Sequence, residues 1–220
     1  MCRITVRRIA GVLFILVVIS TCAVLLYNRW IAIPGGEVIH VWDTRTNFDP
    51  EFIEKLGPEN VAVTGRATDG RSVMVCSINN NGEIEQTTTW NSEGPDSVSA
   101  MTGSQDGHIY IAGLFRGMLP RAESSSIPIT GGGGAFLCKY NTQLELEWEK
   151  IWGHAVSIIA LALSSDGKVI ALGHYEGSAE LDPNSDYELH AEPNAQGFFV
   201  IAFANDGRTE KITIRNTSAV

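Results

Sequence analysis

One stretch of the chain has residue types and spacing that resemble the start of a cation site. Asp182, Asn184 and Asp186 place oxygen-bearing side chains at alternate positions, as the first ligands of a calcium loop do. The usual loop has glycine at position six and glutamate at position twelve. Tyr187 and Pro193 stand there instead. We therefore interpret the stretch as a polar turn between strands.

Histidine could supply metal ligands or a general base. The five histidines are His40, His108, His154, His174 and His190. None forms a His-x-x-x-His pair or lies at zinc spacing from a cysteine. A site shared by His154, His174, Glu176 and Asp182 would require separate loops to converge on one cleft.

Motifs for nucleophilic catalysis and phosphate binding are missing. The sequence contains no Gly-x-Ser-x-Gly elbow. The glycine run Gly131–Gly134 continues into Ala135-Phe-Leu, which predicts a strand, whereas a phosphate loop continues into Lys-Ser/Thr and a helix. We therefore predict no catalytic, cofactor-binding or metal-binding residues.

The elements around these residues form a unit that occurs three times. Its first half is an apolar run that ends in glycine: Val61–Gly65, Ile109–Gly113 and Val169–Gly173. Its second half is an apolar run followed by a polar turn: Ser72–Ile78, Gly134–Tyr140 and Gly197–Phe203. Cys76 precedes Cys138 by 62 residues, as Trp90 precedes Trp152, and Ile201 follows Cys138 after 63.

The runs are short, rich in β-branched and aromatic residues and closed by Gly, Asn or Asp, which predicts strands. Phe198–Phe203 is apolar throughout, so we expect both faces of its strand to be covered. A repeat that holds about four short strands is typical of a propeller blade or a related solenoid. A β-sandwich, whose strands also recur about every 8–12 residues, is the alternative.

Cys76 and Cys138 take matching places in successive units. Stacked sheets lie about 10 Å apart, whereas a disulfide needs Cα atoms within about 7 Å. We therefore expect two free core thiols, with a disulfide as the alternative. Cys2 and Cys22 belong to the N-terminal apolar segment.

The N-terminal segment predicts a membrane anchor. Arg3, Arg7 and Arg8 precede Ile9–Tyr27, which is 19 residues long and uncharged. A helix of that length spans about 28 Å, close to the roughly 30 Å bilayer core. The arginines favour a cytoplasmic N-terminus, and Trp30 follows where aromatic residues favour the interface. A cleaved signal peptide, or a lipoprotein signal with Cys22 as the lipidated residue, is an alternative.

Four segments follow from these patterns. Residues 1–30 form the cytoplasmic stub and anchor, 31–58 a linker and degenerate strand region, 59–214 three propeller-like repeats, and 215–220 a polar tail. Within the second segment, Val38–Trp42 predicts a strand and Glu51–Leu56 predicts one helical turn.

Two stretches resemble bacterial β-propeller repeats of the SBBP type. They are Val98–Phe115, and Glu180-Leu-Asp-Pro183 followed by Gly197–Phe203. Such repeats order a small-residue strand, an Asp-x-x-Gly turn, a strand ending in glycine, a Phe-Asp-Pro loop and an apolar strand. The resemblance covers about residues 59–214, although copy two replaces the acidic loop and copy one lacks it. It implies a propeller-like fold outside the cytoplasm and no particular activity.

Charge narrows the possible partners. No acidic residue precedes Glu37, and four of the 16 basic residues do. The part from Glu37 onward therefore carries 12 basic and 25 acidic side chains, a net charge of −13. Nucleic acid and anionic lipid reward a basic face, which disfavours both as main partners.

The sequence as a whole predicts a single-pass protein of the cell membrane whose bulk is an all-β, propeller-like, extracytoplasmic module. Its expected role is non-catalytic binding or scaffolding of an unknown protein or glycan. The variable loops Gly117–Gly131 and Gly177–Gln196 are the candidate contact sites. Because three units leave open sheet edges, we also expect self-association. The alternative is a propeller-type hydrolase or lyase that acts on glycans at a loop-built site.

Overall fold

The computed structural model describes residues 30–32, 38–40, 48–117, 133–153, 155–177, 179, 181 and 196–217. The chain divides into two compact units, Met1–Asp43 and Thr44–Val220. In the first unit, β1 (Trp30–Ala32) pairs antiparallel with β2 (Val38–His40). The strand predicted at Val38–Trp42 is thus confirmed over Val38–His40.

The described residues contain no helix long and apolar enough to cross a membrane. The predicted anchor Ile9–Tyr27 lies outside the described residues, together with Cys2 and Cys22. The transmembrane helix therefore stays a prediction.

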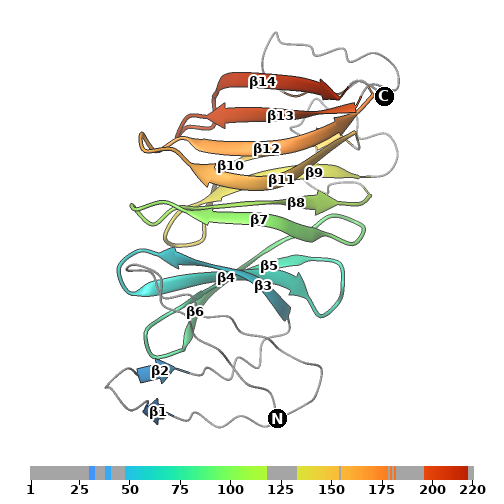
Figure 1. The fold of residues 1–220 in the computed structure, drawn as a ribbon. Helices are drawn as coiled ribbons and strands as arrows, with labels where there is room; N and C mark the ends of the chain where they lie inside the picture. The colour runs from blue at the N-terminus through green and yellow to red at the C-terminus, as the bar shows by residue number, and fades with distance from the viewer. Residues whose placement is uncertain are drawn as a thin grey trace. The chain divides into compact units, whose positions relative to one another are not determined.

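The described residues of the unit Thr44–Val220 form three four-stranded antiparallel sheets, in each of which the strands follow sequence order (Figure 1). The first sheet comprises β3 (Phe48–Leu56), β4 (Asn60–Ala67), β5 (Val73–Ile78) and β6 (Ile84–Trp90). The middle sheet comprises β7 (Ser97–Gly103), β8 (Ile109–Phe115), β9 (Gly134–Tyr140) and β10 (Leu146–Gly153). The last sheet comprises β11 (Val156–Leu163), β12 (Val169–Glu176), β13 (Gln196–Phe203) and β14 (Thr209–Thr217). The all-β prediction is confirmed for these residues.

The prediction of a helical turn at Glu51–Leu56 is wrong, because these residues belong to strand β3. Their side chains alternate between more and less exposed positions, and Ile53 pairs with Val63 of β4. Glu, Lys and Leu favour helices locally, but pairing with a neighbouring strand overrides that weak preference. The first sheet accordingly begins at Phe48.

The repeat glycines occupy one equivalent place in all three sheets. Each lies in the second strand, opposite a bulge in the first strand. The bulges fall between Pro50 and Phe52, between Val98 and Ala100, and between Ile158 and Ala160. A Cβ added at Gly65 or Gly113 would lie 1.9 Å or 2.0 Å from a backbone carbonyl oxygen of the first strand, and one at Gly173 would lie 2.6 Å away. Glycine is therefore required because the bulge brings backbone against backbone.

The third strands are equivalent as well. Cys76, Cys138 and Ile201 each pair with the residue two positions before the repeat glycine. Both cysteines are buried and neither forms a disulfide, which confirms the prediction of core thiols. Burial raises the pKa of the Cys76 thiol to about 11. A buried thiol of this kind behaves as a small apolar side chain.

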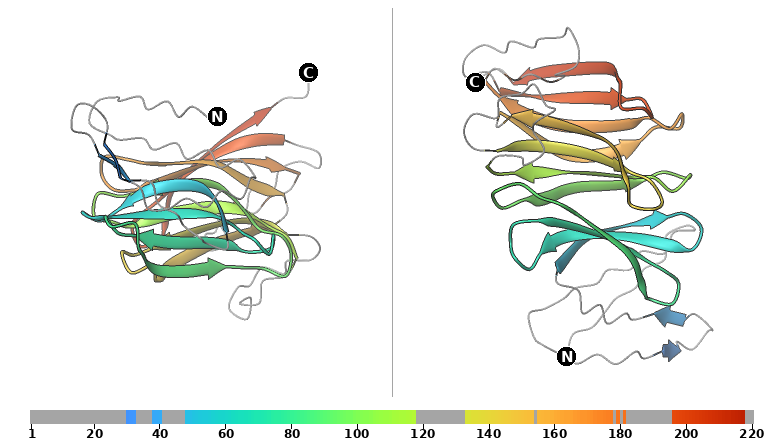
Figure 2. Two further views of the ribbon diagram at one scale, coloured as in Figure 1. Left: turned by 90° about the horizontal axis from the view of Figure 1, so that it is seen from below. Right: turned by 180° about the vertical axis from the view of Figure 1, so that it is seen from behind.

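The sheets lie one after another in the order of the sequence (Figure 2). Side chains of adjacent sheets pack into shared cores. Along β8, Ile109 and Ile111 enter the core shared with the first sheet, whereas Tyr110 and Ala112 enter the core shared with the last sheet. All seven residues of β9 are buried. The middle sheet is therefore covered on both faces, as its continuous apolar runs indicate.

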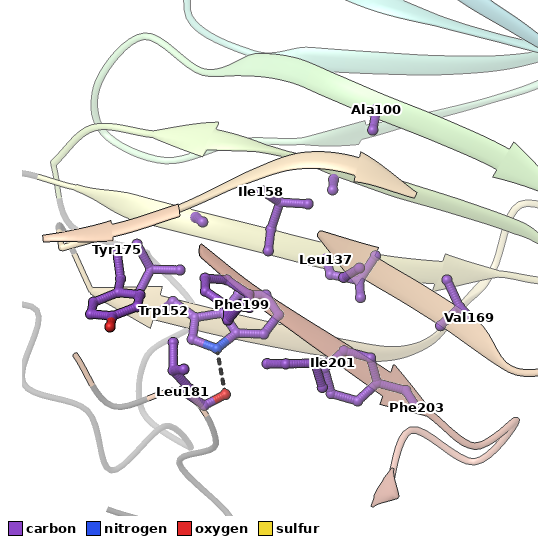
Figure 3. Close-up of a cluster of buried hydrophobic side chains, with 14 of the residues drawn as sticks. Ala100, Leu137, Trp152, Ile158, Val169, Tyr175, Leu181, Phe199, Ile201 and Phe203 are labelled. Atoms are coloured by element: carbon purple, nitrogen blue, oxygen red, sulfur yellow. Dashed lines mark hydrogen bonds between the residues drawn. The ribbon is translucent and has the colours of Figure 1, made fainter. Parts of the chain in front are cut away.

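The core between the middle and last sheets is rich in aromatic residues (Figure 3). The Trp152 and Phe203 rings lie 6.2 Å apart between centroids, and the Trp152 indole Nε1 donates to the backbone oxygen of Leu181 at 2.9 Å. Fully burying a large apolar side chain contributes about 1.5–3 kcal/mol. The contact between sheets therefore provides a large share of the stability of each.

Among the described residues, other sheets cover only one face of the last sheet. Along β13, Phe199, Ile201 and Phe203 are buried, but Phe198 and Val200 are 44% and 39% exposed. The prediction that Phe198–Phe203 is covered on both faces is wrong for this reason.

The glycine opposite the bulge can be tested at Gly113. In Gly113→Ala, the new methyl group would lie 2.0 Å from the Ser97 carbonyl oxygen and 2.6 Å from the Phe136 ring. We expect overpacking to lower the free energy of unfolding by about 2–3 kcal/mol, measured by denaturant unfolding of the full chain.

Gly153→Ala is the matched control, because a Cβ there meets no heavy atom within 4 Å. Its expected change lies within about 0.5 kcal/mol. Equal effects of the two substitutions would contradict the role given to the bulge.

Candidate functional site

Most of the candidate site residues named from the sequence lie outside the described part of the chain. These are the turn Asp182, Asn184 and Asp186, and the histidines His154 and His190. The convergence of His154 and Asp182 with His174 and Glu176 in one cleft therefore stays a hypothesis.

His174 and Glu176 are described, and both lie on β12. Being two residues apart in a strand, they share one face of the last sheet. The His174 ring contacts the Phe198 ring edge-on at 5.5 Å between centroids. Across the described ranges, no three His, Cys, Asp or Glu side chains are grouped to hold a metal ion.

The richest polar cluster of the described residues centres on Lys139, whose side chain is only 3% exposed. Its ammonium donates to Asn205 Oδ1 at 2.6 Å and to the Asn205 backbone oxygen at 3.2 Å. It also forms an ion pair with Glu147 Oε2 at 2.7 Å. These contacts join β9 and β10 of the middle sheet to the turn between β13 and β14.

Aromatic side chains enclose this cluster. The Tyr110 ring lies 5.9 Å from the Lys139 nitrogen, and Trp148 Nε1 donates to the Asn205 backbone oxygen at 3.0 Å. Gly207, with φ of +83°, keeps the same turn close to the Trp148 indole. Burial, with Asp106 and Glu147 nearby, raises the pKa of Tyr110 to about 12.

The cluster extends to His108 at the surface. His108 Nε2 lies 3.2 Å from Glu147 Oε1, and Nδ1 lies 3.1 Å from Asp106 Oδ1 without hydrogen-bond geometry. The Ser104 hydroxyl, which donates to Asp106, and the adjacent His108 hold the pKa of that carboxyl at about 2. Lys139, through its hydrogen bond, keeps the pKa of Glu147 below its usual value.

This arrangement is suited to holding sheets together. A lysine ammonium has three donors, and Lys139 directs them to two oxygens of Asn205 and one of Glu147. A catalytic lysine needs a nitrogen that can lose its proton and reach a substrate. The sequence analysis did not predict a role for Lys139, although it is the one charged residue in the apolar run Gly134–Tyr140.

A buried carboxyl, Asp96, lies in the connection between β6 and β7. Asp96, 1% exposed, accepts from the Ser92 backbone nitrogen at 2.7 Å and from the Ser92 hydroxyl at 2.5 Å. Its own backbone nitrogen donates to the Arg71 backbone oxygen at 2.8 Å. Burial raises the pKa of Asp96. These bonds satisfy Asp96 within its own connection and the adjacent first sheet.

The second candidate is a surface, which we call the outer face of the last sheet. Its apolar members are Ile159, Ala160, Ala162, Ile170, Leu172, Phe198, Val200 and Ala202. Ile159, Leu172, Phe198 and Val200 are 47%, 36%, 44% and 39% exposed. Strand β14 adds a polar row of Lys211, Thr213 and Arg215 along one edge. Neighbouring exposed apolar side chains of this kind mark interaction sites more often than isolated ones do.

No protein family model matches the chain, and no curated protein matches it. Six chains of solved structures match it. One is a protein of unknown function from Bacteroides caccae, which is 8% identical and aligns with a TM-score of 0.41. That match covers 81% of this chain, which in turn spans 65% of the length of the Bacteroides protein. A likeness at this level supports no conclusion about fold or function.

The Lys139–Glu147 pair can be tested with a double-mutant cycle of Lys139→Met and Glu147→Gln. We expect a coupling energy of about 1 kcal/mol at neutral pH, because Glu147 is only partly shielded from water. The pKa of Glu147 is lowered in the folded protein. The coupling should therefore be complete above the ordinary value of 4.5 and disappear as pH falls through the folded pKa.

The control cycle uses Lys168→Met and Glu210→Gln, whose nitrogen and oxygen also lie 2.7 Å apart but at the surface. Its coupling should be smaller and more easily screened by salt. Equal coupling in the two cycles would show that the burial of Lys139 does not strengthen its ion pair with Glu147.

Proposed function

We propose that this chain is a membrane-anchored, extracytoplasmic module of propeller-like repeats that binds or scaffolds a partner and catalyses no reaction. The observation that carries the proposal is the outer face of the last sheet. Leu172, Phe198 and Val200 lie side by side there and are exposed. Exposing adjacent apolar side chains is unfavourable unless another surface covers them.

The propeller-like part of the proposal draws support from the equivalence of the three sheets. Each sheet is a four-stranded meander with a bulge in its first strand and a glycine opposite that bulge in its second strand. A core residue of the third strand pairs at the same place in each sheet. The resemblance to SBBP-type repeats rests on the same residues. Blades of a propeller likewise bury their faces against their neighbours.

The anchor and location rest on the sequence. The uncharged run Ile9–Tyr27 is long enough to span a bilayer, and three arginines precede it. Reduced thiols are compatible with an exported module when they are buried, because oxidation and disulfide exchange need access to the thiolate. Cys76 and Cys138 are 1% and 0% exposed.

The location can be tested by labelling intact bacterial cells with a membrane-impermeant maleimide. Thr89→Cys places a thiol on an exposed residue of β6 whose cross-strand partner is Met74. We expect labelling without permeabilisation, with the protein retained in carbonate-washed membranes. The wild-type chain is the control for Cys2 and Cys22 of the N-terminal segment and for the buried Cys76 and Cys138. Labelling of the variant above this control only after permeabilisation would place the sheets in the cytoplasm.

The binding role can be tested by photo-crosslinking in membranes of the cells that naturally make the protein. A benzophenone amino acid at Leu172 lies on the outer face of the last sheet, and one at Ile84, which is 42% exposed, lies on the first sheet. We expect discrete adducts from position 172 that are absent from position 84. No adduct from position 172 would argue against a binding role for this face.

A further inference from the structure

The three sheets have one equivalent face, which in the first two sheets packs against the next sheet of the chain. In the first sheet Thr64, Val73 and Val75 occupy this face and are 0%, 1% and 0% exposed. The matching residues of the middle sheet are Ala112, Ala135 and Leu137, all 0% exposed. The matching residues of the last sheet are Leu172, Phe198 and Val200, which are 36–44% exposed.

The last sheet thus retains the residue pattern of an internal contact without a neighbour on that face among the described residues. In the first and middle sheets, this face is covered by the next sheet of the chain. We infer that the outer face of the last sheet docks against the same face of a second copy, so that two copies form a symmetric dimer. This inference rests on the proposed binding role and names the partner.

The residue rows of this face suit a two-fold axis parallel to the strands. Cross-strand pairing places Ala160, Leu172, Val200 and Thr213 in one row, and Ala162, Ile170, Ala202 and Lys211 in the next. Such an axis lays β14 of one copy over β11 of the other. The long Lys211 side chain then extends over the small Ala162, and Leu172 meets Val200.

The alternative axis, perpendicular to the strands, lays β14 over β14. It brings Lys211 and Arg215 of one copy towards the same basic row of the other. Like charges brought together across an interface repel each other, which disfavours this arrangement. Closed two-fold dimers are also the commonest symmetric assembly.

The size of the face is sufficient for a stable contact. Four strands of about eight residues span about 19 Å by 26 Å, from a strand spacing of about 4.8 Å and a rise of about 3.3 Å. That is roughly 500 Å² on each copy and about 1,000 Å² in total. Specific interfaces begin at about this total area.

Analytical ultracentrifugation of the purified full chain, in density-matched detergent, tests the inference. We expect a monomer–dimer equilibrium that Leu172→Glu shifts towards monomer by about 100-fold or more in Kd, because symmetry buries the new carboxylate twice. Ile84→Glu is the matched control, with similar exposure on the first sheet, and should leave the Kd unchanged.

Mixing L172E with V200K chains separates loss of contact from loss of folding. With the axis parallel to the strands, position 172 of one chain meets position 200 of the other. The mixture should therefore recover dimers that neither variant forms alone. Failure of the mixture to recover them would overturn the arrangement.

A wild-type chain that is strictly monomeric, or a dimer insensitive to Leu172→Glu, would overturn the inference itself. If the purified chain is monomeric while position 172 still forms adducts with another protein in native membranes, the binding role stands and the second copy is excluded. If both experiments are negative, the binding role fails as well.

Discussion

Every part of this fold depends on one constraint: a four-stranded sheet with two apolar faces cannot shield both of them by itself. The middle sheet meets the constraint on both sides, since alternate residues of β8 enter different cores. Within the described part of the chain, the last sheet meets it on one side only, with Phe199 and Ile201 buried and Phe198 exposed. Since apolar burial is the main favourable term in folding, the sheets stabilise one another.

Both contacts between sheets contain aromatic side chains, and one of them adds a polar cluster. Between the first and middle sheets, Trp90 stacks on Phe136 at 4.0 Å between ring centroids. Between the middle and last sheets, Trp152 packs near Phe203, and Lys139 binds both oxygens of Asn205. Aromatic packing adds stability, whereas burying a charged group adds little net stability even when it is hydrogen-bonded. The Lys139 contacts instead favour one position of the β13–β14 turn, because all three of its donors are satisfied there.

The sequence predicts features that are local and repeated. Short apolar runs closed by glycine or asparagine predict the strands, and the spacing of Cys76, Cys138 and Ile201 predicts their equivalence. Such local patterns do not predict the contacts between sheets. The strand at Glu51–Leu56 depends on pairing with β4, and the exposure of Phe198 depends on which sheet has a neighbour. The Lys139 cluster joins residues 66 positions apart, so no local spacing reveals it.

The bulge and its glycine lie within one sheet, so each unit contains both halves of its most demanding backbone contact. Duplication of the corresponding gene segment would copy the two halves together, with no compensating change needed elsewhere. Gly65, Gly113 and Gly173 persist although the sequences around them have diverged. A unit that carries both its bulge and the opposing glycine can be added or removed as a whole. Evolution can then lengthen or shorten the array by complete units, while selection acts separately on the surface of each copy.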